Sequence, residues 1–299
     1  MRPNFFIVGA PKCGTTALSK YLSEHPNIFI SDVKEPHYFA DDLPKYRYVT
    51  NESDYLSMFD SANATNHRIG EASVFYLYSK VAIENIKKFD PNARIIVMLR
   101  NPLDMVYSMH SQLLYTRDET TAAFAMAWDL CGKRKQGQEI PTCCRDEKLL
   151  FYDEIGMLGA QVERLLNVFA RDQVKIIFYD DFASNTTSVY QETLYFLGLP
   201  FDERSSFSVV NSNKKHKSSL LAQFTQKTPP VLVRGAMKLK AFIGISSWGI
   251  LDKLRNMNTS AEKRPPLDVD LRTQLVDCYH DDIEKLALLT GRDLSAWLR

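Results

Sequence analysis

The segment NFFIVGAPKCGTT (residues 4–16) decides the fold of this 299-residue chain. It reads as a buried strand, a glycine loop and the start of a helix predicted over residues 16–25. The same order returns in RIIVMLRNPLDMVYSMHS (residues 94–111), where the spacing predicts a helix over residues 104–114. Apolar runs predict strands at residues 4–8, 27–30, 94–99 and 174–179. This alternation predicts an α/β fold, with helices on both faces of a parallel sheet of about four to five strands.

Composition and charge exclude several classes of protein. Hydrophobic residues make up 45% of the chain and charged residues 24%, which is typical of a soluble globular protein and excludes disorder. Lys and Arg number 37 against 36 Asp and Glu, so the net charge is +1 and a nucleic acid partner is not expected.

We expect one domain over residues 1–299, with acceptor-binding segments near 38–54 and 114–152 and a helical part over 220–299. Within that part, the apolar spacing of residues 268–289 predicts a terminal helix that docks on the domain.

Cysteine usage and hydropathy give expectations about metals, membranes and compartment. The five cysteines lack the paired spacing of a zinc site, so no metal is predicted. Residues 231–251 are apolar but broken by charged side chains, which predicts peripheral membrane contact at most and no spanning helix. The free thiols and the lack of a signal segment favour a cytoplasmic protein. The oligomeric state is left open.

The glycine loop is a predicted anion site. Backbone N–H groups at a helix N-terminus attract phosphate-like groups, and Lys12 adds a positive charge. Gly9 and Gly14 match the outer glycines of the P-loop of nucleoside triphosphatases, but Thr15 stands where that loop has its lysine. A magnesium-ATP-dependent P-loop phosphotransferase stays open as an alternative, because Asp180 and Asp181 follow the strand at 174–179.

A second binding element follows the strand at residues 94–99. Arg100 stands at the carboxyl end of this strand, where ligands bind in parallel sheets, and an arginine there can grip a phosphate through two donors. Ser108 lies two helical turns further on and can add a hydroxyl.

The lysine-containing loop, followed by strand-Arg-Asn-Pro-x-Asp-x-x-x-Ser, resembles the sulfotransferases that use 3'-phosphoadenosine 5'-phosphosulfate (PAPS) as donor cosubstrate. The resemblance implies a P-loop-like sheet and a metal-independent transfer of the sulfuryl group. It also implies that a late basic loop folds over the nucleotide. The donor-binding residues implied in this way are Lys12, Cys13, Gly14, Thr15, Thr16, Arg100, Ser108, Lys214, Lys215 and Lys217.

The stretch Lys34-Glu35-Pro36-His37-Tyr38-Phe39 is similar to the Lys-Glu-x-x-Phe-Phe stretch of the heparan-sulfate and bacterial carbohydrate branch of these enzymes. In that branch the glutamate is the catalytic base. The resemblance therefore implies Glu35 as base, with His37 in reserve and Lys12 stabilising the leaving group.

The acceptor is predicted only by class. Relatives in the heparan-sulfate branch often carry Glu-Lys-Ser where this chain has Glu71-Ala72-Ser73, so a cation is missing and a less charged acceptor is expected. The resemblance implies a hydroxyl or amine of a carbohydrate, lipid or small metabolite as acceptor, and Tyr46, Tyr48 and Tyr115 are candidate contacts. A non-catalytic nucleotide-binding protein on the same fold is the remaining alternative.

Overall fold

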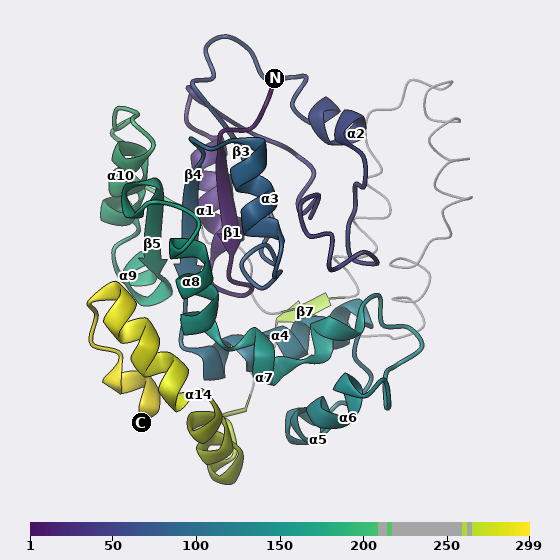
Figure 1. Cartoon of the computed structure of the whole chain (residues 1–299). Coiled ribbons are helices and arrows are strands. Elements are labelled where there is room, and N and C mark those ends of the chain that lie inside the picture. The colour runs from purple at the N-terminus through teal and green to yellow at the C-terminus, as the bar shows by residue number, and fades with distance from the viewer. Residues whose placement is uncertain (209–213, 217–258, 262–264) are drawn as a thin grey trace.

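The computed structural model describes residues 1–208, 214–216, 259–261 and 265–299 (Figure 1). Its centre is a five-stranded sheet in the order β2-β3-β1-β4-β5, in which all neighbouring strands are parallel. The predicted fold class and the four predicted strands are confirmed. The strands are β1 (Phe5–Gly9), β2 (Ile28–Ile30), β3 (Arg68–Ala72), β4 (Arg94–Leu99) and β5 (Val174–Phe178).

The strand β3 was not predicted, although it lies between β1 and β2 in the sheet. Its sequence, Arg-Ile-Gly-Glu-Ala, lacks the apolar run of the other strands. Gly70 is required here because a Cβ atom would lie 2.1 Å from Cζ of the Phe5 ring on the neighbouring strand. Glu71 is 1% exposed and is satisfied by hydroxyl groups described below. The glycine and the buried acid thus interrupt the apolar pattern by which this interior strand could have been predicted from the sequence.

Helices lie on both sides of the sheet (Figure 1). The helix α1 packs against β1, β2 and β3, and α9 and α10 pack against β5. The predicted helix at 104–114 begins two residues earlier, because Asn101 accepts the N–H of Leu103 and Pro102 occupies the first turn. The α-helices outside the C-terminal region are α1 (Thr15–Ser23), α2 (Glu52–Ser57), α3 (Ala82–Phe89), α4 (Pro102–Thr116), α5 (Phe124–Asp129), α6 (Cys131–Lys135), α7 (Tyr152–Ile155), α8 (Leu158–Leu166), α9 (Tyr179–Ser184) and α10 (Thr186–Phe196).

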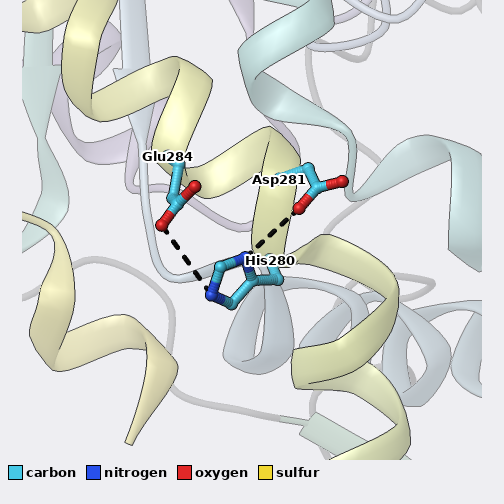
Figure 2. Close-up of side chains that lie close together, drawn as sticks. All are labelled: His280, Asp281 and Glu284. Atoms are coloured by element: carbon cyan, nitrogen blue, oxygen red, sulfur yellow. Dashed lines mark hydrogen bonds and ion pairs between the residues drawn. The ribbon is translucent and has the colours of Figure 1, made fainter.

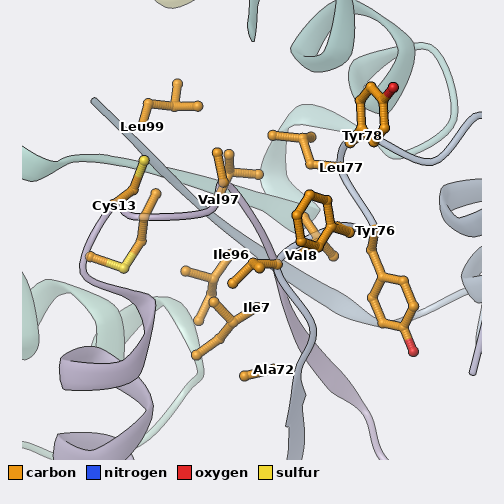
Figure 3. Close-up of a cluster of buried hydrophobic side chains, with 14 of the residues drawn as sticks. Ile7, Val8, Cys13, Ala72, Tyr76, Leu77, Tyr78, Ile96, Val97 and Leu99 are labelled. Atoms are coloured by element: carbon orange, nitrogen blue, oxygen red, sulfur yellow. The ribbon is translucent and has the colours of Figure 1, made fainter. Parts of the chain in front are cut away.

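The core is built on β1 and β4. Both strands are buried on both faces, as expected of a parallel sheet covered by helices. Figure 3 shows Ile7 and Val8 of β1 together with Ile96 and Val97 of β4 in one cluster of buried side chains. This packing gives a rigid support to the loops that follow β1 and β4.

The C-terminal helix α14 (Val269–Thr290) confirms the predicted terminal helix and packs on α8. The carboxylate of Asp282 accepts the backbone N–H groups of Gly159 and Ala160, at the first turn of α8. Beyond α14, Arg292 pairs with Asp181 at the start of α9, and Trp297 is 7% exposed. These contacts join the C-terminal segment to the sheet domain.

A small two-stranded sheet pairs β6 (Lys214–His216) with β7 (Thr259–Ala261), and β6 lies beside α4. The predicted membrane-contact segment 231–251, Lys217 and most of the predicted helical part at 220–299 lie outside the described residues. Among the helices that the structure describes, none has the length and apolar character needed to cross a membrane.

Candidate active site

A cavity of about 660 Å³ opens where the glycine loop and α4 leave the carboxyl ends of β1 and β4. Since these strands are parallel neighbours, the loops that follow them meet at one edge of the sheet. The cavity brings together six residues predicted to bind the donor, although they come from two segments far apart in the sequence. They are Lys12, Gly14, Thr15, Thr16, Arg100 and Ser108.

The glycine loop presents backbone donors to this cavity. Gly14 has φ 89°, a left-handed conformation that glycine adopts without strain, and it begins α1 as its N-cap. The first N–H groups of a helix have no partner within the helix. Within the described part of the chain, no acceptor is recorded for the backbone N–H groups of Gly14, Thr15 and Thr16. The loop therefore fits an anion such as a phosphate or sulfate.

Lys12 and Cys13 differ in where their side chains lie. Lys12 Nζ donates a 2.7 Å hydrogen bond to Oε1 of Gln112 in α4, and both residues line the cavity. Cys13 is 0% exposed, and its thiol lies in the core cluster of Figure 3. Burial raises the pKa of this thiol to about 12, so it is protonated at neutral pH. The structure therefore leaves Cys13 only a backbone role in the predicted donor site.

Arg100 and Ser108 both line the first cavity. Arg100 follows β4 directly and lines the cavity, with its guanidinium 4.9 Å from the centre of the Tyr179 ring. A carboxylate oxygen of Asp104 lies 3.4 Å from Nη2, but Asp104 is half exposed and leaves the remaining guanidinium donors available. Ser108 is 4% exposed on the inner face of α4. Arginine and hydroxyl donors suit a phosphate group.

A second cavity, of about 800 Å³, adjoins the first. It is lined mainly by residues 32–48, with Arg145 from the segment between α6 and α7. Tyr46 and Tyr48, two of the three tyrosines predicted to contact an acceptor, line it; Tyr115 does not. The residues shared by the two cavities are Thr16, Glu35, Tyr46, Gln112, Thr116 and Arg145.

Glu35 lies at the boundary of the two cavities, and both of its carboxylate oxygens have close neighbours. Oε1 is 3.1 Å from Lys34 Nζ, and Oε2 is 3.3 Å from Nε2 of His37. The Glu35 side chain is 21% exposed. A carboxylate held between two cavities can accept a proton from a group in one while a leaving group departs into the other.

His37 lies beneath Glu35 and is 1% exposed. Its Nε2 is near Glu35 Oε2 but lacks the alignment of a hydrogen bond, so this buried nitrogen has no hydrogen-bond partner among the described residues. Burial lowers the pKa of His37 to about 4, so the ring is neutral at physiological pH. His37 lines the second cavity, and its neutral ring stays buried beside Glu35.

Behind this pair lies a buried carboxyl, Glu71. Ser73 donates to its Oε1 at 2.5 Å, while Tyr55 and Tyr76 donate to its Oε2 at 2.8 and 3.0 Å. Burial nevertheless raises the pKa of Glu71 to about 7. Ser73 also accepts the backbone N–H of His37 at 3.0 Å, so this network fixes the segment that carries Glu35.

Arg145 was not predicted, although it lines both cavities. Its guanidinium lies 4.6 Å from the centre of the Tyr46 ring and donates to the buried carboxylate of Asp118. The pairing with Arg145 lowers the pKa of Asp118, although burial acts in the opposite direction. Arg145 falls within the predicted acceptor segment 114–152, but no motif marks it in the sequence.

The predicted late basic loop is described only in part. The backbone of Lys214 and Lys215 forms β6 beside α4, the helix that carries Ser108. Lys217 lies outside the described residues. The roles of these three lysines stay predictions.

The positions of Asp180 and Asp181 bear on the alternative of a magnesium-ATP-dependent phosphotransferase. Asp181 is bound by Arg292, and neither Asp180 nor Asp181 is among the residues that line the two described cavities. This geometry does not favour the magnesium-nucleotide alternative.

A separate cluster of polar side chains lies on α14, where His280, Asp281 and Glu284 are neighbours, with ion pairs of 3.3 and 3.8 Å (Figure 2). All three are exposed and lie within about one helical turn, so helix spacing alone accounts for their proximity.

Comparison with known proteins identifies the family of this chain. The family of the sulfotransferase domain matches residues 2–238. Human carbohydrate sulfotransferase 15 is 27% identical over 70% of this chain and 46% of its own length. Human bifunctional heparan sulfate N-deacetylase/N-sulfotransferase 3 is 26% identical over 99% of this chain and 31% of its own length. The chain thus spans less than half the length of these curated relatives.

A solved structure covers the whole chain. The crystal structure of a sulfotransferase from Alicyclobacillus acidocaldarius is 29% identical, covers 100% of both chains and superposes with a TM-score of 0.73. It shares the parallel sheet flanked by helices. With a family match over most of its length and the loop, arginine and glutamate of the two cavities in place, the chain belongs to the sulfotransferase domain family.

Proposed function

We propose that this protein transfers the sulfuryl group of PAPS to a hydroxyl or amine of a carbohydrate. The observation that carries the proposal is the position of Glu35 at the boundary of two cavities. One cavity holds the anion-binding loop, Arg100 and Ser108, and the other is lined by tyrosines and cations. A transfer reaction needs a donor site, an acceptor site and a base where they meet.

In this proposal the first cavity is the donor site. The N–H groups of Gly14, Thr15 and Thr16 bind the 5'-phosphosulfate, and Arg100 and Ser108 bind the 3'-phosphate. The Tyr179 ring beside Arg100 offers a surface for part of the nucleotide. Lys214, Lys215 and Lys217 follow as candidates for the basic segment that covers the nucleotide.

Glu35 is the proposed general base. Its carboxylate accepts the proton of the acceptor hydroxyl as the acceptor oxygen forms a bond to sulfur. The bond between sulfur and the bridging oxygen breaks, and its electron pair leaves on the 5'-phosphate of the product nucleotide. Lys12 stabilises that developing charge. His37 lines the second cavity beside Glu35, with its Nε2 buried, and stays the alternative base.

The second cavity is the proposed acceptor site. Tyr46 and Tyr48 offer aromatic side chains of the kind that pack against sugar rings, and Arg145 offers a charged donor. The names of two relatives, a carbohydrate sulfotransferase and a heparan sulfate N-deacetylase/N-sulfotransferase, favour a carbohydrate acceptor, and the second name favours sulfation of an amine.

The test is calorimetric titration of the protein with 3'-phosphoadenosine 5'-phosphate (PAP), beside ATP with Mg²⁺. We expect micromolar binding of PAP in buffer containing a chelator, because the proposed contacts need no metal. Binding of ATP with Mg²⁺ and not of PAP would instead support the P-loop phosphotransferase. Binding of PAP without transfer from PAPS to any of a panel of desulfated glycosaminoglycans would support the non-catalytic alternative.

A further inference from the structure

A second cation lies beside the proposed reaction centre. Lys34 Nζ is 3.1 Å from Glu35 Oε1 and donates a 3.1 Å hydrogen bond to Oγ1 of Thr16. The side chains of Lys34 and Glu35 are 22% and 21% exposed, so the pair is largely shielded from water. One ammonium group therefore joins the proposed base to the first turn of α1.

Thr16 places this ammonium at the end of the anion-binding loop. Thr16 lines both cavities, and its backbone N–H has no recorded acceptor among the residues that the structure describes. An anion bound by the loop therefore lies close to the partner of Lys34. The terminal group of that anion must point to the boundary of the two cavities, because transfer requires it to face the acceptor.

The chemistry of lysine allows it to change partners there. An ammonium group has three donors on a flexible stem, and two of them face Glu35 and Thr16. An incoming sulfuryl oxygen can take one of these donors with a small rotation of the side chain. The hold of Lys34 on Glu35 is then weakened at the moment when the base is needed.

On the basis of the proposed function, we propose that Lys34 is a donor-sensing residue, which holds Glu35 in the free protein and binds the sulfuryl group of the donor. This role separates Lys34 from Lys12, whose ammonium bonds to Gln112 on α4. It also separates Lys34 from Arg145, whose guanidinium is held by Asp118.

The test compares PAPS with PAP, which lacks only the sulfuryl group. Both nucleotides are titrated by calorimetry into the wild-type protein and into Lys34→Met. We expect Lys34→Met to weaken PAPS binding about 10-fold, the scale of one charge-assisted hydrogen bond, and to change PAP binding less than about 3-fold. A residue that merely supports the fold would change both affinities together.

Lys45→Met is the matched control. Lys45 lines the same second cavity, but it is 70% exposed and its paired carboxylate, on Glu147, lies 3.8 Å away. We expect this variant to bind both nucleotides like the wild type. Lys34→Arg keeps the charge and should retain most of the preference for PAPS, which also provides a test if the methionine variant melts at a lower temperature.

The outcomes separate this inference from the proposed function. If the wild type binds neither PAP nor PAPS, the donor site itself is wrong and the proposed function fails. If the wild type binds both and Lys34→Met keeps the wild-type ratio of the two affinities, the proposed function stands and the role of Lys34 is overturned. Equal losses for Lys34→Met and Lys34→Arg on PAP and PAPS alike would also overturn it.

Discussion

Ser73 donates a 2.5 Å hydrogen bond to the carboxylate of Glu71 and accepts the backbone N–H of His37 on the opposite side. One hydroxyl group thus links a buried acid in the interior strand β3 to the segment that carries Glu35. Glu71 has two further donors, Tyr55 and Tyr76, from outside this segment. The proposed base is therefore supported by a network built on β3.

Replacing Glu71 by Gln should change how stability depends on pH. The pKa of Glu71 is raised from 4.5 to about 7 by burial, so the folded state binds this proton more tightly than the unfolded state. The resulting stabilisation is present below pH 4.5 and is lost as the pH rises through 7. Between pH 4.5 and pH 8, the free energy of unfolding of Glu71→Gln should rise relative to that of the wild type by on the order of 3 kcal/mol.

Urea denaturation at several pH values measures this difference. The new amide disturbs the three hydroxyl partners, but that cost does not depend on pH. Only the slope of the unfolding free energy against pH is therefore diagnostic. Glu52→Gln, at a carboxylate that is 56% exposed, is the control, and its curve of unfolding free energy against pH should run parallel to that of the wild type. A Glu71→Gln curve parallel to wild type would contradict the raised pKa.

Gly70→Ala should destabilise the sheet. The new Cβ would lie 2.1 Å from Cζ of Phe5, a fully buried ring on β1 that cannot move without disturbing the core. Overpacking of this kind costs about 1–3 kcal/mol, and more where the neighbours are rigid. Gly132→Ala in α6 is the matched control, because a Cβ atom there would have no atom within 4 Å apart from its chain neighbours and its own helix backbone, and helix propensity should make it neutral or stabilising.

Denaturant midpoints of the two alanine variants test the contact. The double variant Phe5→Leu/Gly70→Ala should be less destabilised than the sum of the single changes, because the smaller side chain removes the clash. Strict additivity would show that the Phe5 ring is not the obstacle.

The parts of the fold that were predicted are those with a local signal. The strands β1 and β4 are apolar runs, and each is followed directly by a turn and a helix, so both strand-turn-helix units were predicted from the sequence. The strand β3 had no such signal. Gly70 is there to leave room for the Phe5 ring, and Glu71 is stabilised by hydrogen bonds from three hydroxyl groups. The residues of β3 are therefore determined by contacts with distant parts of the chain and not by a local pattern.

The same distinction holds for the site. Lys12, Arg100 and Glu35 stand in motifs, and all three line the cavity beside the sheet. Arg145 has no motif, since its place depends on Asp118 and Tyr46, which are distant in sequence. Cys13 shows the converse: it lies inside the loop motif, yet its side chain belongs to the core.

Arg100→Ala should weaken nucleotide binding without unfolding the protein. The guanidinium lines the donor cavity, and its charged neighbour, Asp104, is half exposed. Loss of a charge-assisted phosphate contact should weaken PAP binding by about 10- to 100-fold, or about 1.5–3 kcal/mol. Arg2→Ala, at a 57% exposed arginine that lines neither described cavity, is the control. Unchanged PAP affinity in Arg100→Ala would remove the 3'-phosphate assignment.

Glu35→Gln should separate binding from turnover. The amide keeps the shape of the side chain and leaves the donor loop intact, so PAP should bind within about 3-fold of wild type. It cannot accept the proton of the acceptor, and loss of a general base typically costs 100- to 10,000-fold in rate, on the order of 3–5 kcal/mol. Release of PAP from PAPS, measured with desulfated glycosaminoglycans as acceptors, gives the rate. Turnover near the wild-type value would move the base elsewhere, and His37, which is neutral and lines the second cavity, would be the next residue to replace.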